Sequence, residues 1–383
     1  MSVDWDPSAP EVVADQRDAY DRLRSRCPVA HDASGAWTLL RHADVLAAAN
    51  DPVTFSSRVS RHLNVPNGMD GAEHASYRAV VDRYLTADRV EALAPTYRAI
   101  AADVIASVPR GETFRAVTLG ARYAVRAQSA WLGWPAEVED TLIDWMADNH
   151  AATRSGDHEL TARVAERFDA IIRTLLEQAR RTPDPGVMGD LLAEQVEGRP
   201  LTEDQIVSIL RNWTAGDLGS IAVSLGVVVH VLASRPEVQA ELRALALDED
   251  RVRLESAIEE ILRIDDPFVA NRRVTTREVE MGGRKIPIGA RVSLNWTAAN
   301  RDPAVFPDPD AYRPRDHAAD NLVFGTGPHV CPGRGLSLME LAVAIGELLR
   351  TTVGIEHAAG PDAVRETPPV GGWSRVPVLL HRP

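Results

Sequence analysis

The C-terminal third of the sequence contains the stretch Phe324-Gly325-Thr326-Gly327-Pro328-His329-Val330-Cys331-Pro332-Gly333-Arg334-Gly335. Its four glycines let the backbone turn tightly and approach a flat ligand closely. The apolar periodicity of residues 336–345 predicts a helix directly afterwards, so free N–H groups near Cys331 favour a thiolate over a thiol. A lone cysteine beside a helix is most often a small buried hydrophobe. A thiolate held in a glycine-shaped loop is instead a strong axial ligand for haem iron.

This pattern, Phe-Gly-x-Gly-x-His-x-Cys-x-Gly, resembles the haem-binding signature of the cytochrome P450 family, and every defining position is filled. The resemblance implies that Cys331 is the metal ligand, on the proximal side of a haem b. It also implies that Phe324 packs beside the sulfur, that Gly325 belongs to the cofactor-binding loop, and that His329 faces a haem propionate. The family fold is mainly α with small β-sheets, and the haem lies between a long distal helix and the proximal cysteine helix.

Composition sets further limits. No linker or repeat divides the 383 residues, so we expect one domain spanning 1–383. The N-terminus lacks a basic or long apolar segment, and we see no stretch of the roughly 18 to 20 apolar residues that span a bilayer. The net charge of −13 disfavours nucleic acid as a partner. Only Cys27, which we interpret as a core thiol, accompanies Cys331, which fits a reducing cytoplasm. We expect a cytoplasmic monomer.

Hydrophobic periodicity predicts that helices dominate the chain. Apolar residues recur at three- and four-residue spacing in segments 14–25, 89–107, 119–132, 159–181, 203–233, 236–246 and 253–263. Short strands are predicted at 36–40, 273–281, 291–295, 366–370 and 376–381. The number and order of these elements match the resemblance along nearly the whole chain.

Two predicted structural residues lie in the segment 253–263. Glu260 and Arg263 are spaced i, i+3, so they share one helix face and can form a charge-assisted pair. Alone, such a pair is usually solvated. Here it resembles the family's Glu-x-x-Arg lock, which the family closes with an arginine before the cysteine loop. The resemblance places that arginine near Arg315. Counting back from Phe324, however, gives the position that follows Arg315 in the sequence.

Arginine and histidine are natural partners for the two propionates of a haem. His74 and Arg78 are one helical turn apart and match the family's His-x-x-x-Arg on the helix that crosses the haem edge. Arg273 opens a predicted strand and matches another propionate arginine. Outside this context, all three would be interpreted as surface residues.

The predicted distal helix departs from the family pattern, which is Ala-Gly-x-acid-Thr. Ser220 falls in the threonine position and Gly219 falls in the acid position. Asp217 lies three residues before Ser220 on the same helical face, so these two catalytic candidates could relay protons. The alternative is that Asp217 bonds to a bulge in a helix weakened by its glycines.

Substrate-pocket candidates follow from position in the family and indicate an apolar, perhaps aromatic, ligand. Trp213 lies two turns before Ser220, where it either roofs the distal pocket or packs in the core. The candidates are Trp213, Gly216, Val269, Asn271 and Trp373.

The resemblance implies a monooxygenase that inserts one atom of O₂ into a small organic substrate. The sequence shows no flavin or iron–sulfur segment, so we expect electrons from NAD(P)H through a separate ferredoxin reductase and ferredoxin. One alternative is a peroxide-driven, coupling or nitrating haem-thiolate enzyme. Another is a haem gas sensor without turnover, which the absence of an attached signalling domain disfavours.

Overall fold

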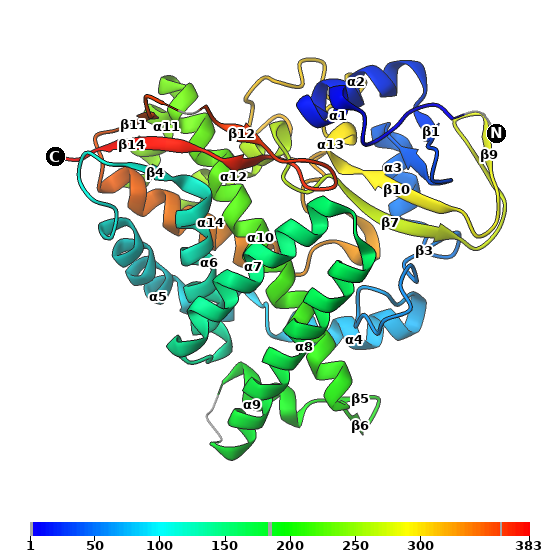
Figure 1. Cartoon of the computed structure of the whole chain (residues 1–383), viewed down its shortest axis with the longest axis horizontal. Coiled ribbons are helices and arrows are strands. Elements are labelled where there is room, and N and C mark those ends of the chain that lie inside the picture. The colour runs from blue at the N-terminus through cyan, green and yellow to red at the C-terminus, as the bar shows by residue number, and fades with distance from the viewer. Residues whose placement is uncertain (1–2, 183–185, 361) are drawn as a thin grey trace.

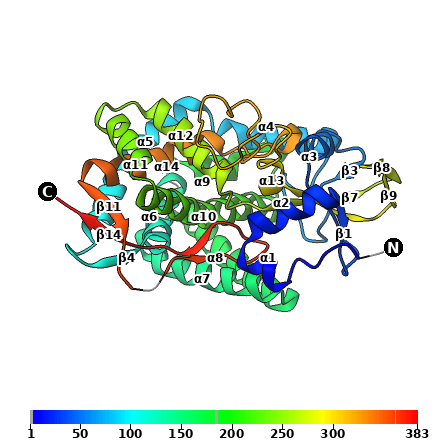
Figure 2. The same cartoon turned by 90° about the horizontal axis from the view of Figure 1, so that it is seen from above.

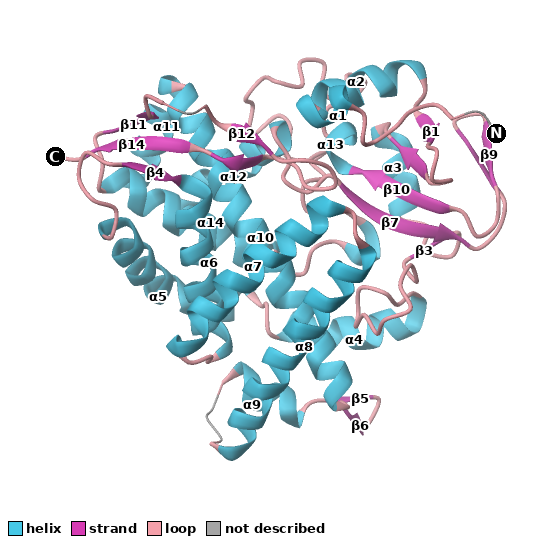
Figure 3. Cartoon of the chain, in the orientation of Figure 1, coloured by secondary structure: helices cyan, strands magenta, loops and turns pink. Residues whose placement is uncertain are grey.

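The structure is a computed structural model, and it describes residues 3–182, 186–360 and 362–383. Helices dominate it, as Figure 3 shows by colour, and the mainly helical prediction with small sheets is confirmed. The α-helices are α1 Pro10–Ala14, α2 Gln16–Arg26, α3 His42–Ala49, α4 Gly71–Arg83, α5 Ala87–Ala106, α6 Ala116–Leu132, α7 Glu139–Ser155, α8 His158–Arg181, α9 Val187–Ala193, α10 Glu203–Ser234, α11 Pro236–Leu247, α12 Arg251–Ile264, α13 Trp296–Ala299 and α14 Arg334–Arg350.

The strands are short and lie mostly outside the helical core. They are β1 Val29–His31, β2 Trp37–Leu39, β3 Phe55–Ser56, β4 Thr113–Arg115, β5 Gln195–Val196, β6 Arg199–Pro200, β7 Ala270–Thr275, β8 Val279–Met281, β9 Arg284–Ile286, β10 Arg291–Asn295, β11 Gly354–His357, β12 Val364–Arg365, β13 Trp373–Arg375 and β14 Pro377–His381. Two 3-10 turns, Ala136–Val138 and Gly327–His329, complete the list.

The long helix α10 is the centre of the molecule. It crosses the molecule diagonally in Figure 1, and from above it lies between α7 and α8 on one side and α12 and α14 on the other (Figure 2). Thr202 and Gln205 form a reciprocal capping box at its start. It ends just before Pro236, which cannot donate the next helical hydrogen bond. Both ends of α10 are therefore fixed by local sequence.

Hydropathy alone would allow α10 to cross a membrane, contrary to our expectation from the sequence. An 18-residue window of α10 has a mean hydropathy of 1.7, but 67% of that window is buried inside the protein. A helix that is apolar on all sides is buried either in a protein core or in a bilayer. Burial against α6, α8, α11, α12 and α14 identifies α10 as a core helix.

Two sheets flank the helices. The larger has the strand order β1-β2-β10-β7-β3, in which β10 pairs with β2 in parallel and the other pairs are antiparallel. The smaller has the order β11-β14-β4 and covers the other end of the molecule. Strand β7 carries Arg273 in register with Val292 of β10, so the larger sheet positions one predicted site residue.

All seven predicted helices are present, with ends shifted by up to three residues. The predicted strand 366–370 is wrong, because this segment forms a turn and a single bridge from Val370 to Phe268. The predicted strand 273–281 is two strands, β7 and β8. The sequence analysis did not predict α3 or α7 as helices.

Candidate functional site

The cysteine loop is built from glycines that no other residue could replace without strain. Cys331 donates its backbone N–H to the carbonyl of Phe324 at 2.9 Å, which closes the turn. Gly325 and Gly327 have φ values of 69° and 72°, in the left-handed region that glycine tolerates. A Cβ on Gly327 would also lie 2.7 Å from the carbonyl oxygen of Ala49 at the end of α3. Cys331 therefore precedes α14 in a fixed turn, as the sequence predicts.

Burial raises the pKa of the Cys331 thiol, and the N–H of Gly333 and the charges of Arg78 and Arg334 only partly oppose this. Burial therefore opposes the effect that we expect from the free N–H groups of the helix N-terminus. A coordinated metal deprotonates a thiol outright. Within the cysteine loop, the guanidinium carbon of Arg334 lies 5.9 Å from the ring centroid of Phe324.

Four basic side chains converge beside this loop. His74 and Arg78 come from α4, Arg273 comes from β7, and His329 comes from the loop itself. The rings of His74 and His329 are 4.1 Å apart between centroids. Arg78 donates to the carbonyl of Val330 at 2.8 Å, which ties α4 to the loop. Residues that are more than two hundred positions apart in the sequence thus form one cluster.

Acidic and hydroxyl side chains partner this cluster: Arg78 pairs with Asp82 at 2.6 Å, and Asp70 lies beside His329. His329 Nε2 lies 3.0 Å from Ser57 Oγ and 3.7 Å from Asp70 Oδ1. Burial, the neighbouring His74 and the charge of Arg273 lower the pKa of His329 to about 4. Burial also lowers the pKa of Arg273, which Asp70 opposes. Sequence reasoning missed Ser57 and Asp70, because neither belongs to a recognisable motif.

These residues fit a haem. His74 and Arg273 are buried and Arg78 and His329 are half-buried, and such arginine and histidine side chains would donate to the two propionates of a haem. Cys331 supplies the thiolate donor that iron prefers in such a loop. We propose that His74, Arg78, Arg273 and His329 would hold the propionates, and that Phe324 and Gly325 would line the sulfur side.

The middle of α10 is less covered than its two flanks. Gly216 is exposed and Gly219 and Ser220 are half-buried, whereas residues 206–210 and 221–229 are buried. The residues around Gly216 and Ser220 are therefore the most accessible part of the middle of α10. This open segment is where the sequence places the distal site.

The side chains of Ser220 and Asp217, predicted to form a relay, are not hydrogen-bonded to each other in the described structure. The hydroxyl of Ser220 donates to the backbone carbonyl of Gly216 at 2.5 Å and to that of Asp217 at 3.1 Å. In the described part of the chain, no hydrogen bond joins this hydroxyl to the Asp217 carboxylate. Ser/Thr hydroxyls commonly bond backwards in this way within helices, so Ser220 is occupied by its own helix.

The Asp217 carboxyl belongs to a buried acid pair. Burial raises the pKa of Asp217 to about 7. Burial and the neighbouring charge of Asp217 raise the pKa of Glu340 on α14. Burial and the charges of both acids also raise the pKa values of the Tyr97 and Tyr123 phenols. Among the described residues, Asp217 Oδ2, both oxygens of Glu340 and the hydroxyl of Tyr97 have no hydrogen-bond partner. The sequence analysis missed Glu340, which looks like an ordinary polar residue of an amphipathic helix.

We predict that the stability of Asp217→Asn, compared with that of wild type, increases as pH rises. The folded-state pKa of Asp217 is raised, so the folded protein binds this proton more tightly than the unfolded chain, and stability falls as pH increases toward about 7. Asparagine removes that loss. The thermal unfolding temperatures of haem-loaded wild type and Asp217→Asn, compared at pH of about 5 and about 8, measure this difference. Asp144→Asn, on the exposed face of α7, is the control. An equal difference from wild type at both pH values would contradict the prediction.

Glu260 and Arg263 form a buried lock. Arg263 is 0% and Glu260 is 2% exposed, and Arg263 donates to both carboxylate oxygens at 2.8 and 2.9 Å. Glu260 also accepts from the backbone N–H of Arg313 at 2.9 Å and contacts His317 Nδ1 at 2.7 Å. The predicted third member, Arg315, is exposed and has no ion pair in the described part of the chain. His317 replaces it, because the loop turns its ring inward two residues later.

Trp213 is a core residue. Its ring packs against those of Trp131, at 5.0 Å between centroids, and Tyr84, at 5.4 Å. Trp373 also lies away from the middle of α10. Its ring stacks on His230 at 3.9 Å, and its indole donates to Asp265 at 3.0 Å. His230 is ten residues beyond Ser220, about 15 Å along the helix, so neither tryptophan lines the space beside Ser220.

The two predicted pocket residues after Pro267 differ in burial. Val269 is 5% exposed and packs in the core beside α2, whereas its neighbour Phe268 is 46% exposed. Neighbouring side chains of an extended segment point to opposite sides, so Phe268 faces away from the core that covers Val269. Asn271 remains exposed, and its side-chain oxygen accepts from the indole of Trp296 at 2.7 Å.

Comparison with known proteins identifies one family. The sequence model of the family described as Cytochrome P450 matches residues 144–352. The cyclomarin C epoxidase CymV of Salinispora arenicola is 32% identical over 91% of this chain and 92% of its own. The vitamin D(3) 25-hydroxylase of Pseudonocardia autotrophica is 31% identical over 94% and 93% of the two chains.

The erythromycin C-12 hydroxylase of Saccharopolyspora erythraea is 31% identical over 85% of this chain and 84% of its own. Among solved structures, a mutant of P450 EryK in complex with erythromycin B superposes with a TM-score of 0.86. That structure is 28% identical and covers 96% of this chain and 97% of its own. Sequence and fold therefore point to one family.

Proposed function

Because this chain belongs to the cytochrome P450 family and is a haem-thiolate monooxygenase, we propose that it inserts one oxygen atom of O₂ into an apolar organic substrate. The electrons come from NAD(P)H through a separate ferredoxin reductase and ferredoxin, in a cytoplasmic protein that forms one domain over residues 1–383. The cofactor is haem b. The fixed glycine turn that presents Cys331 is the observation that carries this proposal.

When bound, a haem supplies oxygen activation that the thiolate favours by donating electron density. The chain's own residues do the rest. Cys331 provides the sulfur donor, and the basic cluster of α4, β7 and the cysteine loop neutralises and orients the propionates. The open segment of α10 gives the substrate and O₂ a space beside Gly216 and Ser220. Residues that exclude water from this space come from the apolar core around it.

The substrate we propose is apolar, aromatic compounds included. Phe268 presents a large exposed aromatic ring beside the segment that precedes β7. The relatives are named for cyclomarin C, erythromycin and vitamin D(3), and one further relative is a linalool 8-monooxygenase from Pseudomonas putida. Burial of apolar surface would favour the binding of such a substrate.

An acidic ferredoxin needs local basic charge on this acidic protein. Arg83 and Arg89, near the end of α4 and the start of α5, and Arg334, beside Cys331, are candidates for such a face. Each is paired: Arg83 with Glu194, Arg89 with Asp190 at 3.4 Å, and Arg334 with both oxygens of Glu259. These pairs reduce the net positive charge there. The exposed arginines 313 and 315, beside the lock on the same loop, extend the candidate face.

The test is product formation coupled to NADH oxidation. Purified protein is first titrated spectrally with compounds ranging from a monoterpene alcohol to a macrolide, and binders are incubated with NADH, ferredoxin reductase and ferredoxin. We expect one oxygenated product molecule per O₂, with the inserted atom labelled by ¹⁸O₂. Turnover with hydrogen peroxide but not with NADH would favour the peroxide-driven alternative. Ligand binding without any turnover would favour a sensor.

A further inference from the structure

A histidine from another helix lies against the open segment of α10. A Cβ placed on Gly219 would be 3.2 Å from Nε2 of His150, which belongs to α7. That distance is shorter than an ordinary van der Waals contact, so the imidazole tip rests directly on the bare backbone at Gly219. The family resemblance places an acidic side chain at this position, and this chain has glycine there.

The position of His150 is fixed from the end of α7. Arg154, one turn later on the same helical face, donates from Nε to Glu366 at 2.9 Å and pairs with the other carboxylate oxygen through its terminal nitrogen. The backbone carbonyl of Glu366 accepts from Gln16 Nε2 at 2.9 Å. Three distant segments thus hold the end of α7 in place, and Figures 1 and 2 both show α7 crossing beside α10.

His150 has both nitrogens available. Neither ring nitrogen makes a hydrogen bond to another residue of the described chain, and the residue keeps some exposed surface. Burial lowers its pKa, with Arg154 adding to this effect and Glu366 opposing it. A neutral imidazole carries a donor on one nitrogen and an acceptor on the other, which is the arrangement that a proton relay requires.

The residues of α10 itself do not provide this chemistry. Ser220 donates its hydroxyl to its own helix, and Asp217 is paired with Glu340 in the helical core. Gly219 has no side chain. Among the described residues, His150 is the titratable side chain that contacts Gly219.

We propose that His150 replaces, from α7, the acidic residue missing at Gly219, and that it delivers protons to the dioxygen being reduced beside α10. This inference rests on the proposed monooxygenase function. In each transfer, Nε2 gives up its proton to oxygen while Nδ1 takes one from water at the exposed side of the ring. The imidazole is left neutral with its proton on the other nitrogen, and exchange with water restores it.

The proton balance is that of the monooxygenase reaction. One O₂, two electrons from NAD(P)H through the redox partners and two protons give one oxygen atom in the product and one water molecule. His150 handles the protons and is neither oxidised nor reduced. Without it, reduced oxygen leaves as hydrogen peroxide, which consumes the same two electrons and two protons without forming product.

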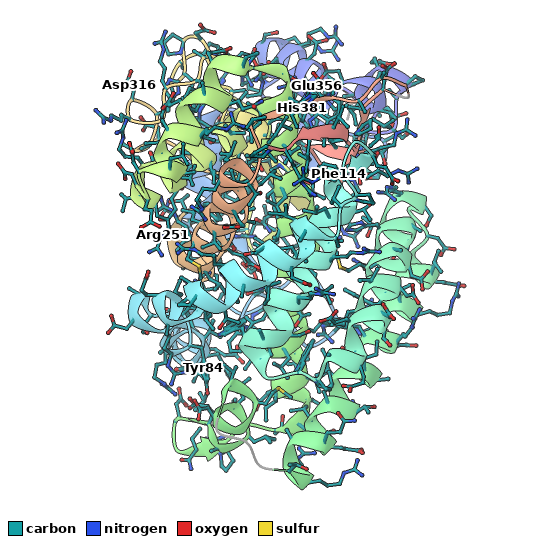
Figure 4. All side chains as sticks on the ribbon, turned by 90° about the vertical axis from the view of Figure 1, so that its left-hand side faces the viewer. Tyr84, Phe114, Arg251, Asp316, Glu356 and His381 are labelled. Atoms are coloured by element: carbon teal, nitrogen blue, oxygen red, sulfur yellow. The ribbon has the colours of Figure 1, made fainter. Side chains whose placement is uncertain are left out.

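His150→Ala and His150→Gln separate hydrogen bonding from proton transfer. A positioned proton-transfer group is worth roughly 10² to 10⁴ in rate, so we expect both variants to release mostly hydrogen peroxide per NADH. The infrared C–O stretch of the ferrous–CO protein gives an independent readout. A donor near the CO oxygen lowers this frequency, so Ala raises it, whereas Gln, which keeps an N–H donor, does not. His381→Ala, which removes an exposed imidazole from β14, serves as the control and leaves both readouts unchanged (Figure 4).

A residue exchange supplies the second test. Gly219→Asp places a carboxylate where the His150 ring lies, so alone it displaces the ring and disturbs the site. Combined with His150→Ala it has room, and we expect the double variant to recover product per NADH relative to His150→Ala. Equal haem content in all variants shows that they fold.

Two results would overturn the proposal. One is wild-type coupling in His150→Gln, which would show that no proton passes through the ring. The other is an unchanged C–O stretch in His150→Ala, which would place the ring away from the bound gas. If the wild-type protein itself forms no product, the proposed function fails, and the infrared comparison still decides where His150 lies.

Discussion

Cys331→Ala is expected to abolish the red-shifted Soret band of the ferrous–CO protein completely. The band reports a thiolate bound to the iron opposite CO, and Cys331 is the sulfur that the fixed turn presents before α14. Alanine fits the turn, because the backbone bond from residue 331 to the Phe324 carbonyl does not involve the side chain. The variant should therefore fold and lose the spectrum and the activity together. Difference spectra of dithionite-reduced protein with CO measure this.

Cys27→Ala is the matched control, because it removes the other thiol of the chain. Cys27 Sγ contacts the carbonyl of Val29 and the guanidinium of Arg284 near the N-terminus, with no contact to the cysteine loop. We expect its ferrous–CO spectrum to equal that of wild type. If the red-shifted band survives in Cys331→Ala but disappears in Cys27→Ala, then Cys27 is the iron ligand and the proposed site is rejected.

Glu260→Ala and Arg263→Ala should each destabilise the protein by about 3 to 5 kcal/mol. Each change leaves one fully buried charge without its partner, which is the costly case for a buried ion pair. Arg263 also donates to the carbonyls of Asn300, Pro309 and Ala311, so it organises the loop that leads to the cysteine. We therefore expect little haem-loaded protein from either variant. Haem content per polypeptide and the midpoint of urea unfolding measure the effect.

His317 and Arg315 form a matched pair for the same lock. His317→Ala removes a buried hydrogen-bond partner of Glu260, so we expect a loss of about 1 to 3 kcal/mol. Arg315→Ala changes an exposed side chain on the same loop and should stay within about 0.5 kcal/mol of wild type. The reverse order of the two effects would restore Arg315 as the third member of the lock.

Much of the fold could be predicted from local patterns. The periodic segments that became α5, α8 and α10 are long, and their apolar faces persist over several turns. The helix α7 escaped prediction because its segment mixes acidic residues with scattered apolar ones, and its buried residues are few. The segment 366–370 has a strand-like pattern, but it forms a turn in which the side chain of Glu366 is buried and accepts from Arg154.

The motif residues of the site were also predictable. The turn around Cys331, the pair Glu260 and Arg263, and the bases His74 and Arg78 lie where the sequence placed them relative to their own elements. Arg273 lies on a strand, as predicted, but in the middle of β7 and not at its start. The predictions that failed concern how side chains face other elements. Trp213 and Asp217 lie on the long helix as expected, but their side chains turn toward α6 and α14, respectively.

The sequence by itself determined the elements whose cause is local: the glycine turn before α14, the capped ends of α10 and the i, i+3 pair of α12. Backbone conformation and helix-face spacing depend on residues a few positions apart, so one chain segment specifies them. Only the tertiary structure decided which partners meet across the fold. His317 closing on Glu260, Glu340 facing Asp217 and His150 lying over Gly219 each join segments more than fifty residues apart. Such contacts depend on the packing of whole helices, which no spacing within one segment encodes.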